Sequence, residues 1–262
     1  MLKKTLFSLF SFMIVLGLAA CSGDTSNDAL EEKADLVSNE ADSEEEKAEA
    51  EVKAIKYYEW LEEAMDTQTI TVYAEIENTG NTNIDAGWAK ITYLDADGSV
   101  IAVNESQISP RFIKKGGTSY LSEEIEGDIE KYKDLDDVKI EVSPVPFLDA
   151  EIVEFTTRDE KLNIGTWGEK NAQISVTGFV ENESDINFTE DDTSATIGLY
   201  DEDGEFLAAQ SSSQGQGFSL DANGETSFEV AGGWPLPPEI GEKVERAEVK
   251  ANGIENMDDY WW

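Results

Sequence analysis

Two short acidic turns are the places in this sequence where side chains most obviously have the types and spacing to do chemistry. The residues are Asp95 and Asp97 before Gly98, and Asp201 and Asp203 before Gly204. Carboxylates at this spacing offer oxygen ligands for Ca²⁺, but an EF-hand loop needs a Glu six residues after its Gly, where this chain has Asn104 and Gln210. The same pattern is typical of a hairpin turn, in which Asp accepts backbone hydrogen bonds and Gly takes a positive φ. The turn is the favoured interpretation, and a weak divalent-cation site is the alternative.

The composition excludes several kinds of chemistry. The formal charge is 19 − 57 = −38, with no His and one Cys. This excludes a basic nucleic-acid-binding surface, His-based catalysis, His-ligated metal and an intrachain disulfide. A carboxylate-based hydrolase would need two acids about 5–10 Å apart in a cleft, and no segment singles out such a pair. We therefore predict no catalytic residue, no cofactor and no enzymatic activity.

The start of the chain has the pattern of a secretory signal. Lys3 and Lys4 precede an apolar run over 6–18, too short to span a bilayer of ~30 Å as a mature helix. The run ends in Leu-Ala-Ala-Cys, which resembles the lipobox of bacterial lipoproteins. The resemblance implies that residues 1–20 are removed and that the thiol of Cys21 carries a diacylglycerol, so that acyl chains such as palmitate anchor the protein at the extracytoplasmic face of the membrane. The alternative is an ordinary cleavage site beside an accidental Cys.

Residues 21–53 form an acidic segment that separates this anchor from the rest. Between Ser22 and Val52 there are twelve acids and two Lys, a net of −10. Such a segment cannot bury enough apolar surface to offset its ordering entropy. We predict a disordered tether reaching roughly 30 Å, with a helical stalk as the alternative. The charge left beyond the tether and the signal is −38 + 10 − 2 = −30.

The remainder of the chain repeats itself. The matching blocks are 70–78 with 174–182, 91–98 with 197–204, and 118–120 with 226–228. Their order and spacing agree, with offsets of 104, 106 and 108, so two domains follow, at 54–146 and 147–262.

Within each half the apolar residues alternate with a period of two. Ile70, Val72, Ala74 and Ile76 face one way, and the intervening Thr, Tyr and Glu residues face the other. Several short strands of this kind, with Gly- and Asn-rich turns, favour an antiparallel sandwich in each half. The predicted fold class is therefore all-β, with two tandem immunoglobulin-like sandwiches after the tether.

The residues around the two acidic turns resemble the signature of the FxLYD domain. In the second half the matching residues are Ile197, Leu199, Tyr200, Asp201 and Gly204, with Ile in place of the leading Phe. In the first half they are Tyr93, Leu94, Asp95 and Gly98, with Tyr and Leu exchanged. The resemblance covers roughly 54–254. It implies an immunoglobulin-like sandwich displayed on bacterial lipoproteins, and it brings no agreed catalytic residues.

Large aromatic residues have two interpretations. Trp60, Trp88, Trp167 and Trp234 are expected to fill the cores, with exposed stacking platforms for sugars as the alternative. The run Tyr260-Trp261-Trp262 either folds back onto the second domain or serves as a docking tag.

Together these observations predict a non-catalytic binding or scaffolding protein outside the cell membrane. Its partners would be the membrane, through Cys21, and an unknown protein or wall ligand, with no nucleic acid. The alternatives are a calcium-dependent cell-wall or carbohydrate-binding protein and a carboxylate-based hydrolase.

Overall fold

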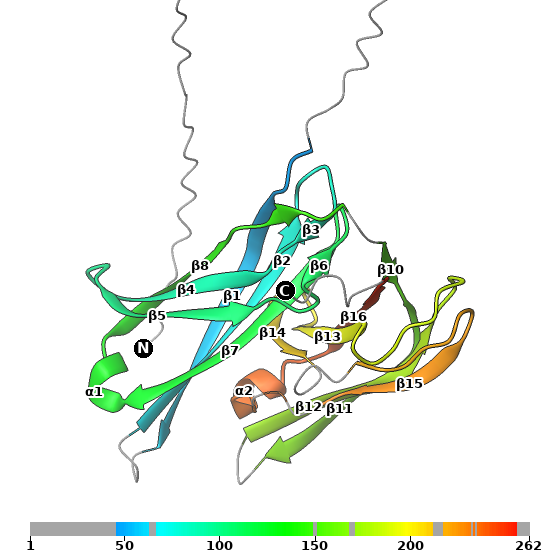
Figure 1. The fold of residues 1–262 in the computed structure, drawn as a ribbon. Helices are drawn as coiled ribbons and strands as arrows, with labels where there is room; N and C mark the ends of the chain where they lie inside the picture. Colours follow the sequence, from blue (N-terminus) through cyan, green and yellow to red (C-terminus); the bar gives the residue numbers. More distant parts are fainter. Residues whose placement is uncertain are drawn as a thin grey trace, which may run out of the picture. The chain divides into compact units, whose positions relative to one another are not determined.

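The described part of the chain is built almost wholly of antiparallel strands, which confirms the predicted all-β fold class (Figure 1). The structure is a computed structural model that describes residues 46–62, 67–148, 151–167, 171–211, 217–231, 233 and 235–255. The predicted signal, Cys21, most of the predicted tether and the aromatic run at 260–262 lie outside these residues.

The first half is a sandwich of two three-stranded sheets. One has the order β1-β2-β7 and the other β5-β4-β8. Their bounds are β1 (Ala50–Glu62), β2 (Thr67–Asn78), β4 (Trp88–Asp95), β5 (Val100–Gln107), β7 (Thr118–Asp128) and β8 (Leu135–Val142). Helix α1 (Ile129–Tyr132) joins β7 to β8, and a small sheet of order β6-β3-β9 contains β3 (Ile84–Asp85), β6 (Phe112–Ile113) and β9 (Val145–Pro146).

The second half repeats this architecture. Its sheets have the orders β11-β12-β15 and β10-β16-β13-β14. Their bounds are β10 (Ile152–Glu154), β11 (Thr156–Trp167), β12 (Asn171–Glu181), β13 (Thr193–Tyr200), β14 (Phe206–Ser211), β15 (Glu225–Val230) and β16 (Arg246–Ile254), with helix α2 (Pro238–Gly241) before β16. In the first half β2 pairs with β7 and β4 pairs with β8. In the second half the equivalent strands pair in the same way, β12 with β15 and β13 with β16. This crossing between sheets is typical of immunoglobulin-like sandwiches.

Equivalent asparagines show how closely the halves correspond. The Nδ2 of Asn78 donates to the carbonyl oxygen four residues on, at 2.9 Å, and to that of Ile113, at 3.1 Å. The Nδ2 of Asn182 donates to the carbonyl oxygen four residues on, at 2.7 Å, and to that of Asp221, at 3.0 Å. Both side chains are buried. Each buried asparagine therefore binds carbonyls of two loops at once, and losing these hydrogen bonds is costly.

The inward rows predicted from the period of two are the cores of the two sandwiches. Ile70, Val72, Ala74 and Ile76 are fully buried in the first half. Ile174 and Val176 are fully buried in the second.

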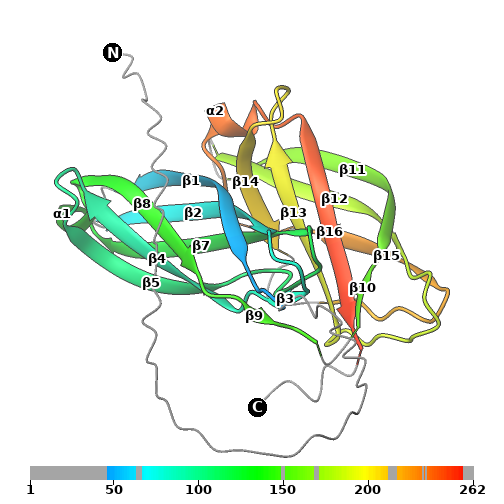
Figure 2. The same ribbon diagram turned by 90° about the horizontal axis from the view of Figure 1, so that it is seen from above.

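The middle of the outward row of β2 is also buried, contrary to expectation. Thr71 and Tyr73 are 1% and 0% exposed. The reason is that β13 and β14 of the second half pack across the outer face of the β1-β2-β7 sheet (Figure 2). This sheet is therefore covered on both sides, and the described residues belong to one compact unit, Glu44–Trp262.

Aromatic side chains make the contact between the halves, which we call the inter-sandwich interface. Tyr120 stacks on Phe206 with ring centroids 6.1 Å apart, and its hydroxyl lies 3.0 Å from that of Tyr200. The hydroxyl of Tyr58 donates to the carbonyl oxygen of Leu207 at 2.7 Å. A Cβ on Gly198 would collide with the Tyr120 ring. The missing side chain of Gly198 is what lets the tyrosine approach the β13 backbone.

The predicted match of residues 118–120 with 226–228 is wrong by one residue. Tyr120 lies opposite Glu75, on the outer face, whereas Phe228 lies opposite Gly178 and points into the second core. Because side chains alternate with a period of two, a slip of one residue exchanges the faces. Leu121, not Tyr120, is the counterpart of Phe228.

The first sandwich begins earlier than predicted. β1 starts at Ala50, within the segment predicted to be the tether, and pairs antiparallel with β2, with Ala50 opposite Asn78 and Glu62 opposite Thr67. The acidic residue Glu51 is tolerated because it is exposed on the strand. The alternative of a helical stalk reaching Val52 is wrong for the described residues.

A pair of glycine substitutions tests the inter-sandwich interface. Gly198→Ala puts a methyl group into the Tyr120 ring, so we expect the free energy of unfolding to fall by about 1–3 kcal/mol. Gly165→Ala is the matched control, because Gly165 also lies in a strand, is exposed and has its nearest neighbour 3.8 Å from the added Cβ. Urea denaturation measures both variants. Equal stabilities would contradict the interface.

Candidate functional site

The two acidic turns are hairpin turns with matching hydrogen bonds. In the first, the Oδ1 of Asp95 accepts hydrogen bonds from the backbone N–H of Asp97, at 3.0 Å, and of Ser99, at 2.8 Å. In the second, the Oδ1 of Asp201 accepts from Asp203 at 3.0 Å and from Glu205 at 2.8 Å. The glycines that follow, Gly98 and Gly204, both have φ of 80°. One oxygen of Asp95 and one of Asp201 are thus used to hold the turn.

These turns do not gather further ligands. Within the described residues, no three His, Cys, Asp or Glu side chains are grouped so that they could hold a metal ion. Asp97 and Asp203 are exposed at the tips of their turns. The geometry therefore explains the Asp-x-Asp-Gly pattern by turn formation.

The motif residues lie in the framework of the sandwiches, not in a cleft. Ile197 and Leu199 are fully buried in the second core, and Tyr93 is fully buried in the first, where its ring meets that of Tyr132. Tyr200 points outward into the inter-sandwich interface, and Leu94 is its counterpart. The exchange of Tyr and Leu between the halves follows: only the second half has a partner for an outward-pointing tyrosine.

An open groove lies on the outer face of the β11-β12-β15 sheet, and we call it the sheet groove. It has a volume of about 670 Å³, within the ~300–1,000 Å³ of small-molecule sites. Its lining residues are Asp159, Lys161, Thr177, Gly178, Phe179, Ser227, Phe228 and Glu229. In the first sandwich the equivalent face is the one that β13 and β14 cover.

One aromatic ring and several polar groups face the sheet groove. Phe179 is 37% exposed and has the guanidinium of Arg158 4.6 Å from its ring centroid. Arg158 is held by ion pairs to Asp159, Glu181 and Glu225, which raise its pKa. The ring is therefore positioned before any ligand arrives, which lowers the entropic cost of binding.

Three polar side chains that line the sheet groove are available to a ligand. The side chains of Lys161, Thr177 and Ser227 make no hydrogen bond or ion pair within the described part of the chain. They offer an ammonium group and two hydroxyl groups around the ring. Such a set can bind a ligand with both an apolar face and hydroxyl groups.

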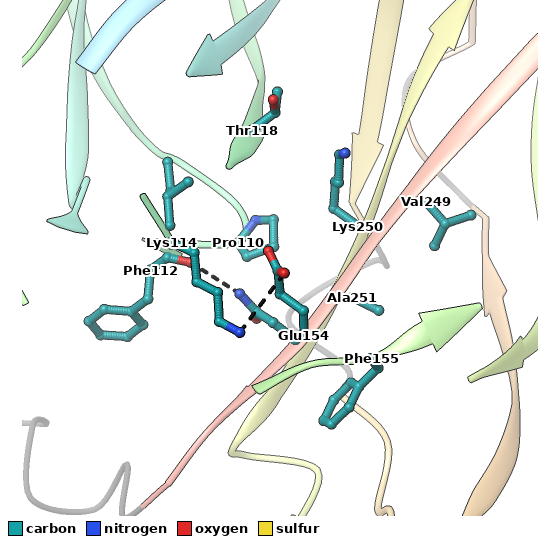
Figure 3. Close-up of a pocket in the computed structure, with 11 residues that line it drawn as sticks. Pro110, Phe112, Lys114, Thr118, Glu154, Phe155, Val249, Lys250 and Ala251 are labelled. Atoms are coloured by element: carbon teal, nitrogen blue, oxygen red, sulfur yellow. Dashed lines mark hydrogen bonds and ion pairs between the residues drawn. The ribbon is translucent and has the colours of Figure 1, made fainter. Parts of the chain in front are cut away.

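A second hollow, the interface groove, lies where the halves meet (Figure 3). It has a volume of about 230 Å³ and lies between the loop around β6 and strands β10 and β16. Lys114 and Lys250 both line it; the Lys114 side chain points toward Glu154, whereas the Lys250 side chain points away from it (Figure 3). The Nδ2 of Asn252 donates to the carbonyl oxygen of Phe112 at 3.1 Å and ties the two halves together there.

Titratable groups at the inter-sandwich interface are shifted by burial. Burial raises the pKa of Tyr120 and of Tyr200, so both phenols stay neutral. Burial also raises the pKa of Glu75, and its hydrogen bond with Tyr200 opposes that shift. A carboxyl whose pKa is raised on folding favours the folded state most below its unfolded pKa, and this contribution fades as the pH rises.

The prediction that the tryptophans fill the cores is wrong for Trp88, which is 60% exposed on the outer face of β4. Trp60 is half-buried. The side chain of Trp167 and all of Trp234 lie outside the described residues, as does Cys21. Sequence reasoning missed Phe179, although an aromatic residue on the outward row of a predicted strand was a signal for it.

Comparisons with known proteins do not assign this chain to a family. No family model matches the chain, and no curated protein matches it. Among solved structures, a crystal structure of red sea bream transglutaminase is similar over 78% of this chain and 30% of that chain, at 10% sequence identity and a TM-score of 0.22. A likeness at that TM-score carries no argument. Among the described residues, no helix has the length and apolar character needed to cross a membrane.

Substitutions at Asp201 separate a turn from a calcium site. Asp201→Ala removes the acceptor for two backbone N–H groups, so we expect a loss of about 1 kcal/mol of stability, while Asp201→Asn keeps an acceptor oxygen and most of the stability. Millimolar CaCl₂ should leave the melting temperature of the parent protein unchanged. A calcium-induced rise that Asp201→Asn abolishes would show a cation site instead.

Proposed function

We propose that this protein is a lipid-anchored binding or scaffolding protein on the extracytoplasmic face of a bacterial cell membrane, with two FxLYD-like sandwiches and no catalytic role. The apolar run that ends at Cys21 supports the anchor, and the acidic segment after it supports a spacer. Each methylene of an acyl chain contributes ~0.8 kcal/mol on insertion, so two chains hold the protein without help from the folded part.

The sheet groove is the observation that carries the binding role. The same face of the sandwich is covered in the first half and open in the second. A solvent-facing aromatic ring among unpaired polar groups is typical of a recognition surface on a rigid scaffold.

The anchor is tested at its attachment residue. We expect Cys21→Ser to appear in the medium or as unprocessed precursor, because it has no thiol to acylate. Ser22→Ala, next to it, is the matched control and should remain in the membrane fraction. Fractionation and intact mass spectrometry check both variants, and mature membrane-bound Cys21→Ser protein would contradict the anchor.

The sheet groove favours a carbohydrate as a second, more specific candidate. A sugar ring has an apolar face that can stack on Phe179, and hydroxyl groups that Lys161, Thr177, Ser227 and Glu229 can bind. All of these residues come from strands β11, β12 and β15 or the bulge in β11, so a regular backbone positions them. Carbohydrate binding in the sheet groove does not require a bridging calcium ion.

Removing the Phe179 ring tests this candidate. We expect Phe179→Ala to weaken retardation in gels containing soluble wall glycan by at least about tenfold, a loss typical of an aromatic anchor. Val103→Ala is the control, because Val103 is 52% exposed on the first sandwich, away from the groove. Equal retardation of the two variants would rule out this groove, and no retardation of the parent protein by any glycan would rule out the candidate.

A further inference from the structure

The residues that precede β1 lie at one end of the first sandwich, and we call the surface there the tether end. It is formed by the segments 78–84, 107–118 and 143–148. The backbone N–H of Thr79 donates to the carbonyl oxygen of Glu49 at 3.0 Å. The side-chain oxygen of Asn83 accepts from the backbone N–H of Lys115 at 3.1 Å, and its carbonyl oxygen accepts from that of Phe147 at 2.8 Å. These hydrogen bonds join the three segments and the start of β1 into one surface.

The tether end differs in charge from the protein as a whole. Its three segments contain Arg111, Lys114 and Lys115 and no Asp or Glu, in a chain of net charge −38. Arg111 is paired with Asp85, and the ammonium group of Lys114 lies 3.9 Å from a carboxylate oxygen of Glu154. Lys115 is exposed and makes no ion pair with any of the described residues. Its ammonium group is therefore available to an anionic partner.

The opposite end of the first sandwich is strongly acidic (Figure 1). It consists of the turn at 95–99 and the segment 128–137, which contains α1. Together these hold seven acids and two lysines. The length of β1, 13 residues or ~40 Å, separates the two ends. Charges are screened beyond about 8 Å at physiological ionic strength, so a partner at the tether end does not experience the repulsion of the acidic end.

Apolar side chains are exposed at the tether end as well. Val145 and Leu148 are 55% and 56% exposed, although Phe147 between them is buried. The ring of Phe147 packs against that of Phe112, with centroids 4.3 Å apart. The buried ring holds the loop in place, so that it presents two aliphatic side chains to the solvent.

Exposed aliphatic groups with an unpaired cation form a surface that fits an anionic bilayer. Alkyl groups enter the boundary between headgroups and acyl chains, and ammonium groups are attracted to the lipid phosphates. The predicted lipid on Cys21 connects to the tether end through residues 22–45, so this end is the nearest to the anchor along the chain. A tethered surface has an effective concentration of order millimolar, so a weak contact with the bilayer is sufficient.

We propose that the tether end binds the surface of the membrane. Val145 and Leu148 enter the headgroup region of an anionic bilayer, and Lys115 pairs with lipid phosphates. The inference rests on the proposed lipid anchor, which keeps the protein near the membrane but does not orient it. The contact supplies the orientation: the tether end of the first sandwich faces the lipid and the acidic end faces away.

Amine footprinting on vesicles tests which end meets the bilayer. The chain 21–262 is coupled through its only thiol to a maleimide phospholipid, in vesicles of phosphatidylcholine with phosphatidylglycerol, so it is anchored whether or not cells acylate Cys21. We expect acetylation of Lys115 to be at least about threefold slower than in the uncoupled chain. Lys131, exposed at the acidic end, is the internal control and should react at an unchanged rate.

The possible results separate the contact from the anchor. No slowing at Lys115, or equal slowing at Lys131, would overturn the proposal. Slowing of the same size on vesicles of phosphatidylcholine alone would overturn the preference for an anionic bilayer. Because the anchor itself is tested by Cys21→Ser in cells, its failure and the failure of this contact are distinguished.

Substitution of the exposed aliphatic residues gives an independent test. Val145→Asp with Leu148→Asp should remove the slowing at Lys115, because carboxylates are repelled by an anionic bilayer. The matched control is Val100→Asp with Val103→Asp, which replaces two side chains of β5 that are also more than half exposed and should keep the slowing. Urea denaturation checks that the variants fold, and Leu148→Asp alone, outside any strand, replaces the double variant if that one is unstable. Equal slowing in the test and control variants would contradict the contact.

Discussion

The contact of the Tyr120 ring with the bare backbone at Gly198 is the constraint on which the arrangement of this molecule depends. It brings the β13-β14 layer onto a sheet whose other face already forms a core, so the middle of β2, at Thr71 and Tyr73, becomes buried on both sides. The buried hydroxyl of Tyr120 has a hydrogen-bond partner in this layer, the hydroxyl of Tyr200 at 3.0 Å.

The strands and turns of each half could be predicted from local pattern alone. A period of two sets the inner rows, and Asp-x-Asp-Gly sets the hairpins, because both depend on neighbours in the sequence. The burial of Tyr73 could not be predicted in this way, because the layer that covers it lies more than a hundred residues further on. The one-residue slip at Tyr120 arose because Thr-Ser-aromatic occurs in both halves, while the aromatic faces opposite sides.

The candidate sites were less predictable than the fold for a related reason. Sequence reasoning located the residues that build the turns and cores, such as Asp201 and Leu199, and these residues serve the framework. Both grooves combine residues from separate segments, as when the loop around β6 and strand β16 both line the interface groove. No short motif records such a meeting. Phe179 was the exception, because an aromatic residue in an outward row is visible in the sequence.

The inter-sandwich interface joins different faces of the two halves, and such a heterologous contact can in principle repeat from molecule to molecule. The free faces at the two ends are the counterparts of the two faces that are joined inside the chain. Their residues have diverged: Asn163, Thr177 and Ser227 stand where the joined face has Tyr58, Tyr73 and Tyr120, and Thr92 stands in place of Gly198. These two free faces lack the tyrosine rings and the glycine that accommodates one of them. They therefore cannot form a second contact like the inter-sandwich interface. Because of this divergence, the contact forms once within each chain and does not repeat between chains. The open sheet around Phe179 is left available for a different partner.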